Sequence, residues 1–304
     1  KQFLRGVGCY GAEAKIEGFS GYLCELLIIK YKTFYSLLIE AKSWRYMTRI
    51  VIDKDSDAMF DNPLIVVDPV DPRRNVASAL SKDKFDLFIV ASREYIRKPS
   101  LRFFYPESVR PWSIDKIKKE LKRRSGVFLG VELDKPDILD ENLYPQLRKA
   151  IRVLKETCER YGFSIIDIGF TVLDDKKKIY IIINTAQDSL PPFEVHMGPP
   201  VYLKNNVDDF MGKWMDDPRV VKKPYIKDGR VYVEKRREYD NIYKMLEKGL
   251  KGLSLGKDIT NMLKKGYRVI KEEDVITSDL RGYWTIYLDG RYPWEREGDE
   301  KLAG

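Results

Sequence analysis

Carboxylates and basic side chains are the groups of this sequence best able to do chemistry, because it contains a single histidine, His196. One imidazole cannot build a histidine triad or a His-rich metal site. His196 lies in an alternating segment, residues 193–197, which favours a structural role for its ring. Any hydrolytic or transfer chemistry would therefore depend on carboxylates and metal ions.

The alternating aspartates Asp53, Asp55 and Asp57 match the first ligand positions of a calcium loop. Ala58 and Leu64 stand where that loop needs glycine and glutamate, so a solvated turn is the better interpretation. Two-metal nucleotidyl transfer would need a Gly-Ser turn followed by an Asp-x-Asp at a strand end, and the sequence contains no such arrangement. We therefore predict no metal site and no catalytic residue in this chain.

Residues 6–11 have the G-x-G-x-x-G spacing of dinucleotide-binding folds. That function requires a strand before the glycines and a helix after them, so that the helix N-terminus approaches a pyrophosphate. Here the preceding residues are helical in pattern and residues 12–18 are extended. We interpret the glycines as permitting a bend between a helix and the next segment.

Lysine and arginine outnumber aspartate and glutamate by 55 to 47, which favours a polyanionic partner. The excess is concentrated in residues 116–124 and 222–237. Three separated cysteines, without a C-x-x-C pair, indicate neither disulfides nor zinc and fit a reducing cytoplasm. No apolar run approaches the roughly 20 residues of a membrane span, so we expect no membrane partner. The chain enters an apolar-periodic stretch directly after Lys1, which suggests that a segment upstream has been removed.

The pattern of apolar residues predicts an α+β protein. The first hundred residues are mainly helical in pattern, with two strands at residues 48–52 and 64–67. Its helices are expected at 21–32, 33–41, from Arg74 and at 81–97. A basic helix from Ser113, an amphipathic helix ended by Gly162 and strands at 127–133, 165–172, 179–184 and 193–197 follow. Beyond Pro200 we expect helices at 206–215, 239–250 and 258–265, a hairpin at 225–232 and a final strand at 284–288.

Three motifs in order carry a family resemblance: residues 11–13, residues 18–28 and residues 67–77, the last reading V-D-P-V-D-P-R-R-N-V-A. The first two resemble the segment that joins head to central domain in archaeal-type (class I) CCA-adding tRNA nucleotidyltransferases. The third is similar to that family's D-P-V-D-x-x-R-N-V-A motif. Residues 135–138, 140–147, 197–199 and 255–257 continue the match, which weakens after Gly266.

The resemblance implies a helical central domain of the nucleotidyltransferase and oligoadenylate synthetase type, a body with an antiparallel sheet and a small α/β tail. We expect the central domain at 1–110, the body at 111–202 plus 265–304, and the tail at 203–264. In the family a head domain supplies the carboxylates and Mg²⁺. The central domain closes the nucleotide pocket, the body binds the acceptor stem of tRNA and the tail binds its elbow. The resemblance thus implies CTP, ATP and tRNA as substrates and an inactive chain where the head is absent.

Individual residues are carried over by position. Lys1 and Tyr10 fall on positions that contact the incoming triphosphate, although Tyr10 could be a packed aromatic and Lys1 could be frayed. Arg74 falls on the arginine that helps to read the base edge of CTP or ATP together with the RNA backbone, although it could simply pair with Asp71. Gly256 and Lys257 open a helix that could bind an RNA phosphate, or form an ordinary capped surface helix.

Lys119 and Arg123 lie in the basic run 116–124, which could follow an acceptor stem or be a solvated helix face. A non-catalytic RNA-binding module, or one half of a split enzyme, remains an alternative to the transferase. A second alternative is a nucleotidyltransferase with a different product, since the central domain also resembles oligoadenylate synthetases and poly(A) polymerases. Whether the chain forms a homodimer stays open.

Overall fold

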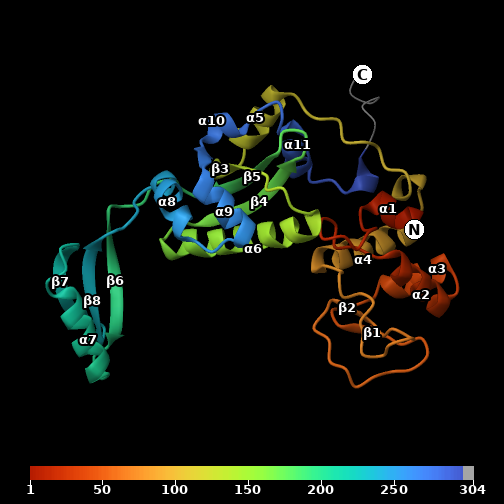
Figure 1. Cartoon of the computed structure of the whole chain (residues 1–304), viewed down its shortest axis with the longest axis horizontal. Coiled ribbons are helices and arrows are strands. Elements are labelled where there is room, and N and C mark those ends of the chain that lie inside the picture. Colours follow the sequence, from red (N-terminus) through yellow and green to blue (C-terminus); the bar gives the residue numbers. More distant parts are fainter. Residues whose placement is uncertain (297–304) are drawn as a thin grey trace. The chain divides into compact units, whose positions relative to one another are not determined.

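The computed structural model describes residues 1–296, which divide between two compact units (Figure 1). The first unit contains Lys1–Ser113, Ile138–Pro145 and the segment from Gly282 onward. The second contains Ile114–Asp137 and Gln146–Arg281. The mixture of helices and antiparallel sheets confirms the predicted α+β class.

Four helices form most of the first unit: α1 (Gln2–Val7), α2 (Gly21–Tyr31), α3 (Phe34–Ala41) and α4 (Lys82–Arg97). The N-caps are the ones that the sequence indicates, because the Ser20 and Thr33 hydroxyls accept hydrogen bonds from the amides of Leu23 and Ser36. Aromatic rings fill the core between the helices, with Phe3, Phe19 and Phe88 almost completely buried. The predicted helices at 21–32, 33–41 and 81–97 are thus confirmed.

The two predicted strands of this unit are also present, as β1 (Thr48–Ile50) and β2 (Leu64–Val66), which pair in parallel. In the loop between them the Asp55 carboxylate accepts hydrogen bonds from Arg49, at 2.7 Å from Nη2. The Asp55 carboxylate is therefore paired with the Arg49 side chain in this surface loop. Within residues 1–296 no group of three or more His, Cys, Asp or Glu side chains could hold a metal ion.

Two predicted elements of this unit were wrong. The segment after Arg74 forms turns instead of a short helix, because the buried Asn75 side chain binds the backbone at Val66 and Ala77. The segment 284–288 is part of a helix, α11 (Arg281–Asp289), instead of a strand. Trp284 and Leu288 are four residues apart and both are buried, so the helical period decides the structure of this short apolar run.

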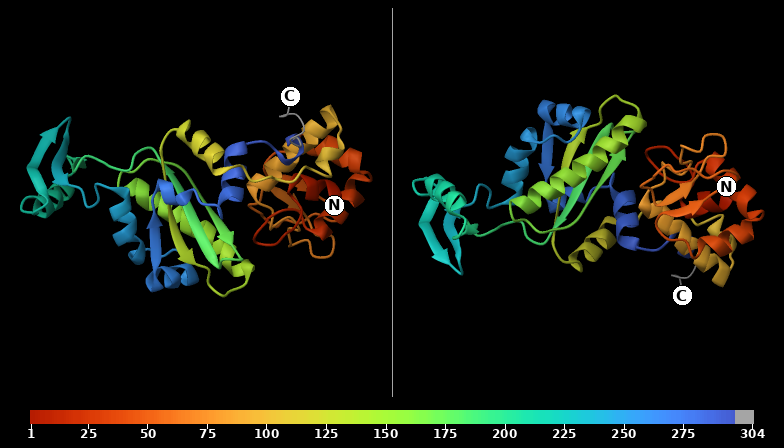
Figure 2. Two further views of the ribbon diagram at one scale, coloured as in Figure 1. Left: turned by 90° about the horizontal axis from the view of Figure 1, so that it is seen from above. Right: turned by 90° about the horizontal axis from the view of Figure 1, so that it is seen from below.

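The second unit contains a four-stranded antiparallel sheet with the order β4-β5-β3-β9. Its strands are β3 (Val127–Asp134), β4 (Ile165–Leu173), β5 (Lys178–Thr185) and β9 (Tyr267–Ile270). The long helix α6 (Asp140–Arg160) lies along one face of this sheet (Figure 2). This unit also contains the helices α5 (Ile114–Lys122), α8 (Ile242–Gly249), α9 (Lys257–Lys265) and α10 (Glu272–Val275).

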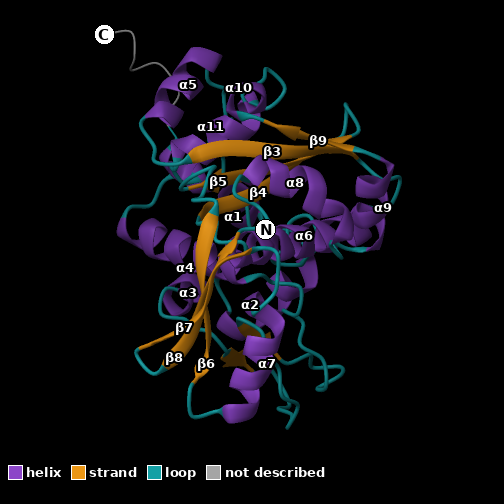
Figure 3. Ribbon diagram, turned by 90° about the vertical axis from the view of Figure 1, so that its left-hand side faces the viewer, coloured by secondary structure: helices purple, strands orange, loops and turns teal. Residues whose placement is uncertain are grey.

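A separate three-stranded sheet, in the order β6-β8-β7, lies next to helix α7 (Lys204–Trp214) (Figure 3). Its strands are β6 (Phe193–Pro200), β7 (Val220–Lys227) and β8 (Arg230–Arg236). The Asp228–Gly229 turn has φ values of 46° and 73°, the left-handed pair of a type I′ hairpin, as predicted. We call β6, α7, β7 and β8 the tail module.

The strand pairing differs in detail from the expected domain boundaries. β6 pairs with β8, whereas a boundary at residue 202 separates them. The Trp294 ring stacks on Phe103 with centroids 5.0 Å apart within the first unit, whereas the expected boundaries place residue 294 in the body; the boundaries themselves stay a prediction. No helix within residues 1–296 combines the length and apolar character needed to cross a membrane.

Candidate functional site

The connection between α1 and α2 depends on glycines that let backbone segments approach closely. Gly8, with φ 79°, ends α1 in the left-handed conformation. A Cβ on Gly6 would lie 2.2 Å from the carbonyl oxygen of Phe103, and a Cβ on Gly18 would lie 2.1 Å from that of Cys9. Gly6 lies within α1 and Gly8 caps it, so a helix stands where a dinucleotide site needs a strand; the glycines serve the predicted bend and also permit tight packing.

This bend brings Tyr10 to the start of α2. Tyr10 forms a parallel bridge with Phe19, and the amide of Gly11 donates to the Phe19 carbonyl at 2.9 Å. A Cβ placed on Gly21, the first residue of α2, would lie 3.5 Å from the Tyr10 hydroxyl and 3.8 Å from Lys1 Nζ. Lys1 and Tyr10, which the sequence analysis singled out separately, therefore meet at one helix N-terminus.

The first turn of α2 is electrostatically suited to an anion. The backbone N–H groups at the start of a helix lack intrahelical acceptors and the helix dipole is positive there, although in α2 the Ser20 hydroxyl already accepts from the Leu23 amide. The Lys1 ammonium adds a full charge beside them, and it donates a hydrogen bond to Glu25 at 2.9 Å. This contact with Glu25 raises the pKa of Lys1, so the ammonium is charged at neutral pH. Lys1 remains about half exposed and can reach a ligand.

The next residue of this turn, Tyr22, connects α2 to Arg74. The Tyr22 hydroxyl donates to Asp68 Oδ1 at 3.1 Å, and Arg74 Nη1 lies 3.9 Å from Asp68 Oδ2. Asp68 is 3% exposed, whereas the Arg74 side chain is 67% exposed. A buried carboxylate thus holds a guanidinium that faces solvent. The alternative ion pair of Arg74 with Asp71 does not form: the Asp71 carboxylate accepts from the Arg73 backbone amide at 3.1 Å, and the Asp71 carbonyl accepts from the Arg74 amide at 2.9 Å.

Hydrogen bonds keep the Asp68 carboxylate ionised in spite of its burial. The Val70 amide donates to it at 3.0 Å, and this bond together with the Tyr22 hydroxyl and the Arg74 charge lowers the pKa of Asp68. The sequence analysis named neither Tyr22 nor Asp68 as a site residue. Both lie inside the quoted motifs, 18–28 and 67–77, which was the available signal.

Asn75 fixes the loop that carries Arg74. Its amide oxygen accepts from the backbone N–H groups of Val66 and Ala77, each at 2.9 Å. Its amide nitrogen donates at 3.0 Å both to the Leu64 carbonyl and to the Asn62 side chain. Because three of these bonds are buried and the one to Asn62 is partly buried, the loop is tied to β2 and its conformation is well determined.

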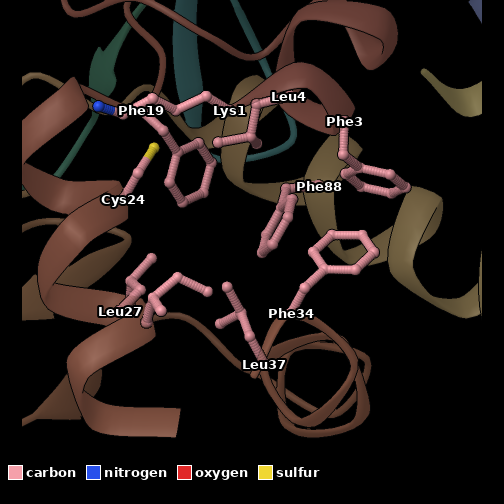
Figure 4. Close-up of a pocket in the computed structure, with 10 residues that line it drawn as sticks. Lys1, Phe3, Leu4, Phe19, Cys24, Leu27, Phe34, Leu37 and Phe88 are labelled. Atoms are coloured by element: carbon pink, nitrogen blue, oxygen red, sulfur yellow. The ribbon is translucent and has the colours of Figure 1, made fainter. Parts of the chain in front are cut away.

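A small, mainly apolar cavity of about 40 Å³ has Lys1 among its lining residues (Figure 4). Phe19, Cys24 and Leu27 form one wall, and Phe34, Leu37 and Phe88 lie opposite. Neither Tyr10 nor Arg74 lines it. The cavity is therefore a gap in the aromatic core, and the polar candidate site lies outside it.

The basic residues predicted to contact tRNA are spread over the second unit. Lys119 is exposed on α5, whose buried residues are Ile117 and Leu121; Arg123, exposed in the turn just after α5, pairs with Glu120 at 3.0 Å. This is the geometry of a basic helix face open to solvent. It is compatible with phosphate contacts, as the sequence analysis expected of this run.

The start of α9 is partly satisfied within the protein. Gly256 has φ 103°, and a Cβ there would lie 2.8 Å from the Gln146 side-chain oxygen. That oxygen accepts from the Asp258 amide at 2.8 Å, and the Gln146 amide nitrogen donates back to the Asp258 carboxylate at 2.8 Å. One of the amides that could have held a phosphate thus already has a partner, and a carboxylate lies in the first turn.

Comparison with known proteins agrees with this arrangement. Residues 1–105 match the family model described as "tRNA nucleotidyltransferase, second domain", and residues 124–272 match "CCA-adding enzyme, C-terminal domain". The chain belongs to the archaeal-type CCA-adding enzyme family. It is 37% identical to the CCA-adding enzyme of Methanosarcina mazei over 90% of its length, and 38% identical to that of Pyrobaculum neutrophilum over 80%.

The chain spans about three fifths of the length of the curated relatives it matches. The aligned region covers 60% of the Methanosarcina mazei enzyme and 63% of the Methanosarcina barkeri enzyme, to which the chain is 36% identical. The matched region is the second and C-terminal domains, so what the entire relatives do is assigned to this chain only as a proposal.

The geometry around Gly21 predicts a local response to triphosphate. Titration of the chain with ATP should shift the amide NMR signals of Gly21 and Tyr22. Lys1→Gln and Tyr10→Phe should each weaken this apparent affinity by about two- to fivefold, the effect of losing one charge or donor at a helix N-terminus. Tyr35→Phe, which changes an exposed tyrosine on α3, is the matched control. The same apparent affinity for ATP in all three variants would contradict the assignment of Lys1 and Tyr10 to the triphosphate site.

Proposed function

We propose that this chain is the nucleotide-selecting and tRNA-binding portion of a CCA tRNA nucleotidyltransferase. Such an enzyme adds C, C and A to the 3′ end of tRNA from CTP and ATP without a nucleic-acid template. The observation that carries the proposal is the first turn of α2, where Lys1 and Tyr10 approach Gly21 while Tyr22 leads through Asp68 to Arg74. A family assignment and a charged, partly exposed site thus support the same function.

Each side chain has a role that suits its chemistry. Lys1, Tyr10 and the α2 N-terminus bind the triphosphate, through a point charge, a hydroxyl and backbone amides. Arg74 reads the base edge of cytosine or adenine, because its planar fork of donors can satisfy base acceptors and also contact an RNA phosphate. Asp68 orients Arg74 from the protein side. The exposed guanidinium of Arg74 is free to reach the ligand.

The basic surfaces of the second unit supply the grip on tRNA. Lys119 on α5 and Arg123 just after it contact the acceptor stem through phosphates, and Gly256 and Lys257 contribute at α9. At α9 the ammonium of Lys257 is the more effective part, because Gln146 already occupies the Asp258 amide. The tail module binds the elbow of tRNA. These contacts hold the 3′ end near the nucleotide pocket while successive nucleotides are added.

The metal chemistry is assigned elsewhere. Nucleotidyl transfer uses Mg²⁺ ions held by clustered carboxylates to bridge the triphosphate and the attacking hydroxyl. The described residues offer no cluster of that kind, so they do not fit Mg²⁺ and we derive no step through it from this chain. We propose that a head segment such as the family resemblance implies supplies these carboxylates, and that the enzyme works in the cytoplasm.

The role of Arg74 can be tested in a chimera that carries the N-terminal segment of the Methanosarcina mazei enzyme ahead of Lys1. With labelled CTP or ATP, the 304-residue chain alone should incorporate nothing, whereas the chimera should extend tRNA. In the chimera, Arg74→Ala should lower kcat/KM for both nucleotides by about tenfold to a hundredfold, because a charged hydrogen-bond donor is lost from the base edge.

Arg73→Ala is the matched control, since Arg73 is an exposed neighbour in the same loop. Incorporation by the chain alone would refute the assignment of the metal site. A large loss of tRNA affinity in Arg74→Ala, with kcat/KM for the nucleotides unchanged, would show instead that Arg74 positions the RNA backbone.

Binding of tRNA is tested separately on the chain itself. A tRNA transcript should bind more tightly than an unrelated RNA duplex of equal length, and the affinity should fall at least about tenfold between about 50 and about 200 mM salt as counterions compete for the phosphates. Filter binding or fluorescence anisotropy gives both quantities. A chain that prefers neither RNA would exclude a tRNA-binding role, whereas tight binding without activity in the chimera would favour the non-catalytic RNA-binding module.

A further inference from the structure

The tail module has a sheet with two different faces. The ring of His196 on β6 stacks on Phe210 of α7, with centroids 5.8 Å apart, and the buried Val233 of β8 is its cross-strand partner. Side chains alternate between the faces along a strand, so one face of the sheet packs against α7 and the neighbouring positions belong to the other. We call this second surface the open face.

The register assigns the residues of the open face. On β6 it carries Phe193, Val195 and Met197, whose side chains are 43%, 58% and 57% exposed. Their partners on β8 and the next partners on β7 complete the face with Arg236, Glu234, Tyr232, Lys222 and Tyr225. Three aromatic rings and two aliphatic side chains thus lie on one face of the sheet, with Phe193, Val195 and Met197 exposed on it.

Cations lie over the rings of this face. The Arg236 guanidinium is 5.6 Å from the centroid of Phe193, and Lys222 Nζ is 4.0 Å from that of Tyr225. The rings of Tyr225 and Tyr232 stack with centroids 5.9 Å apart. The single carboxylate of the face, Glu234, is neutralised by Lys222 at 3.4 Å. The open face therefore combines flat apolar rings with the positive charges of Arg236 and Lys222.

The charge of the surrounding strands has the same sign. Residues 220–236, which comprise β7, the turn and β8, contain six lysines and arginines and only two acidic residues. An excess of this kind attracts a polyanion. The open face thus complements a ligand that is flat and aromatic at its centre and negatively charged at its edges.

We propose that the open face of the tail module binds RNA by stacking an exposed base plane on Phe193 and the tyrosines, with Arg236 and Lys222 on the flanking phosphates. The proposal rests on the proposed tRNA-binding function and specifies which surface of the tail recognises RNA, and by which chemistry. Stacking on aromatic side chains suits unpaired bases or the open end of a base stack, and it tolerates different base identities.

A protein partner fits this surface less well than RNA does. A self-associating apolar face would bring Arg236, Lys222 and the remaining basic residues of 220–236 against the same charges of a second copy. A phosphate ligand alone would not account for the exposed Phe193, Val195 and Met197. Bases and phosphates together account for both features.

The experiment measures the affinity of the full chain for a tRNA transcript. Phe193→Leu, which removes the ring and keeps an apolar side chain, should weaken binding roughly tenfold, whereas Phe193→Tyr should bind like the wild type. Arg236→Gln should weaken binding and also reduce the slope of log affinity against log salt by about one, because one phosphate contact is lost. Phe193→Leu should leave that slope unchanged.

Tyr202→Leu provides the matched control, because Tyr202 is 83% exposed and follows β6 outside the sheet. Far-UV circular dichroism verifies that each variant is folded. Wild-type affinity in Phe193→Leu, or an equal loss in Tyr202→Leu, would overturn the stacking surface while leaving tRNA binding by the chain intact. Sedimentation that shows Phe193→Leu changing the oligomeric state without changing tRNA affinity would instead identify a protein interface and overturn the proposal. If the wild-type chain shows no preference for tRNA, the proposed function itself fails, which is a different result.

Discussion

The buried carboxylate of Asp68 is the interaction on which the candidate site depends. Burying a charge is costly unless it is hydrogen-bonded and paired; here the Val70 amide and the Tyr22 hydroxyl donate to it, and the Arg74 guanidinium lies 3.9 Å away. Together they lower the pKa of Asp68. Stability from an acid with a lowered pKa is present above its unfolded pKa and is lost as the pH falls through the folded value, so the link is intact at neutral pH. Asp68 thereby connects the first turn of α2 to the loop that presents Arg74.

Local signals in the sequence predicted most of the helical unit and the tail hairpin. Ser20 and Thr33 cap helices because their hydroxyls accept hydrogen bonds from amides of the first helical turn. Asp228-Gly229 forms the hairpin turn because both residues tolerate positive φ. Arg74 and Trp284 show where local reasoning failed. Turns replace the helix at Arg74 because Asn75 binds Val66 and Leu64, about ten residues earlier in the chain. No window of sequence around Arg74 contains that information.

The candidate site was predictable only through family motifs. Those motifs singled out Lys1, Tyr10 and Arg74, but their proximity to α2 depends on the bend at Gly8 and the bridge from Tyr10 to Phe19, which are tertiary features. Tyr22 and Asp68 were missed because a tyrosine in a first helical turn and an aspartate before a proline have common structural roles. At α9 the sequence indicated a free helix N-terminus, whereas Gln146, which is 112 residues away from Asp258, occupies one of its amides.

An ionised Asp68 positions Arg74 for nucleotide selection. The most direct test of this role is Asp68→Asn in the chimera with the Methanosarcina mazei N-terminal segment. Asparagine keeps the size of the side chain and an acceptor oxygen, but it removes the charge that holds the guanidinium. The account predicts that kcat/KM for CTP and ATP falls by about tenfold while tRNA affinity is unchanged. Asp71→Asn, in the same loop and exposed, should have little effect. Wild-type nucleotide use in Asp68→Asn, or equal losses in both variants, would contradict the account.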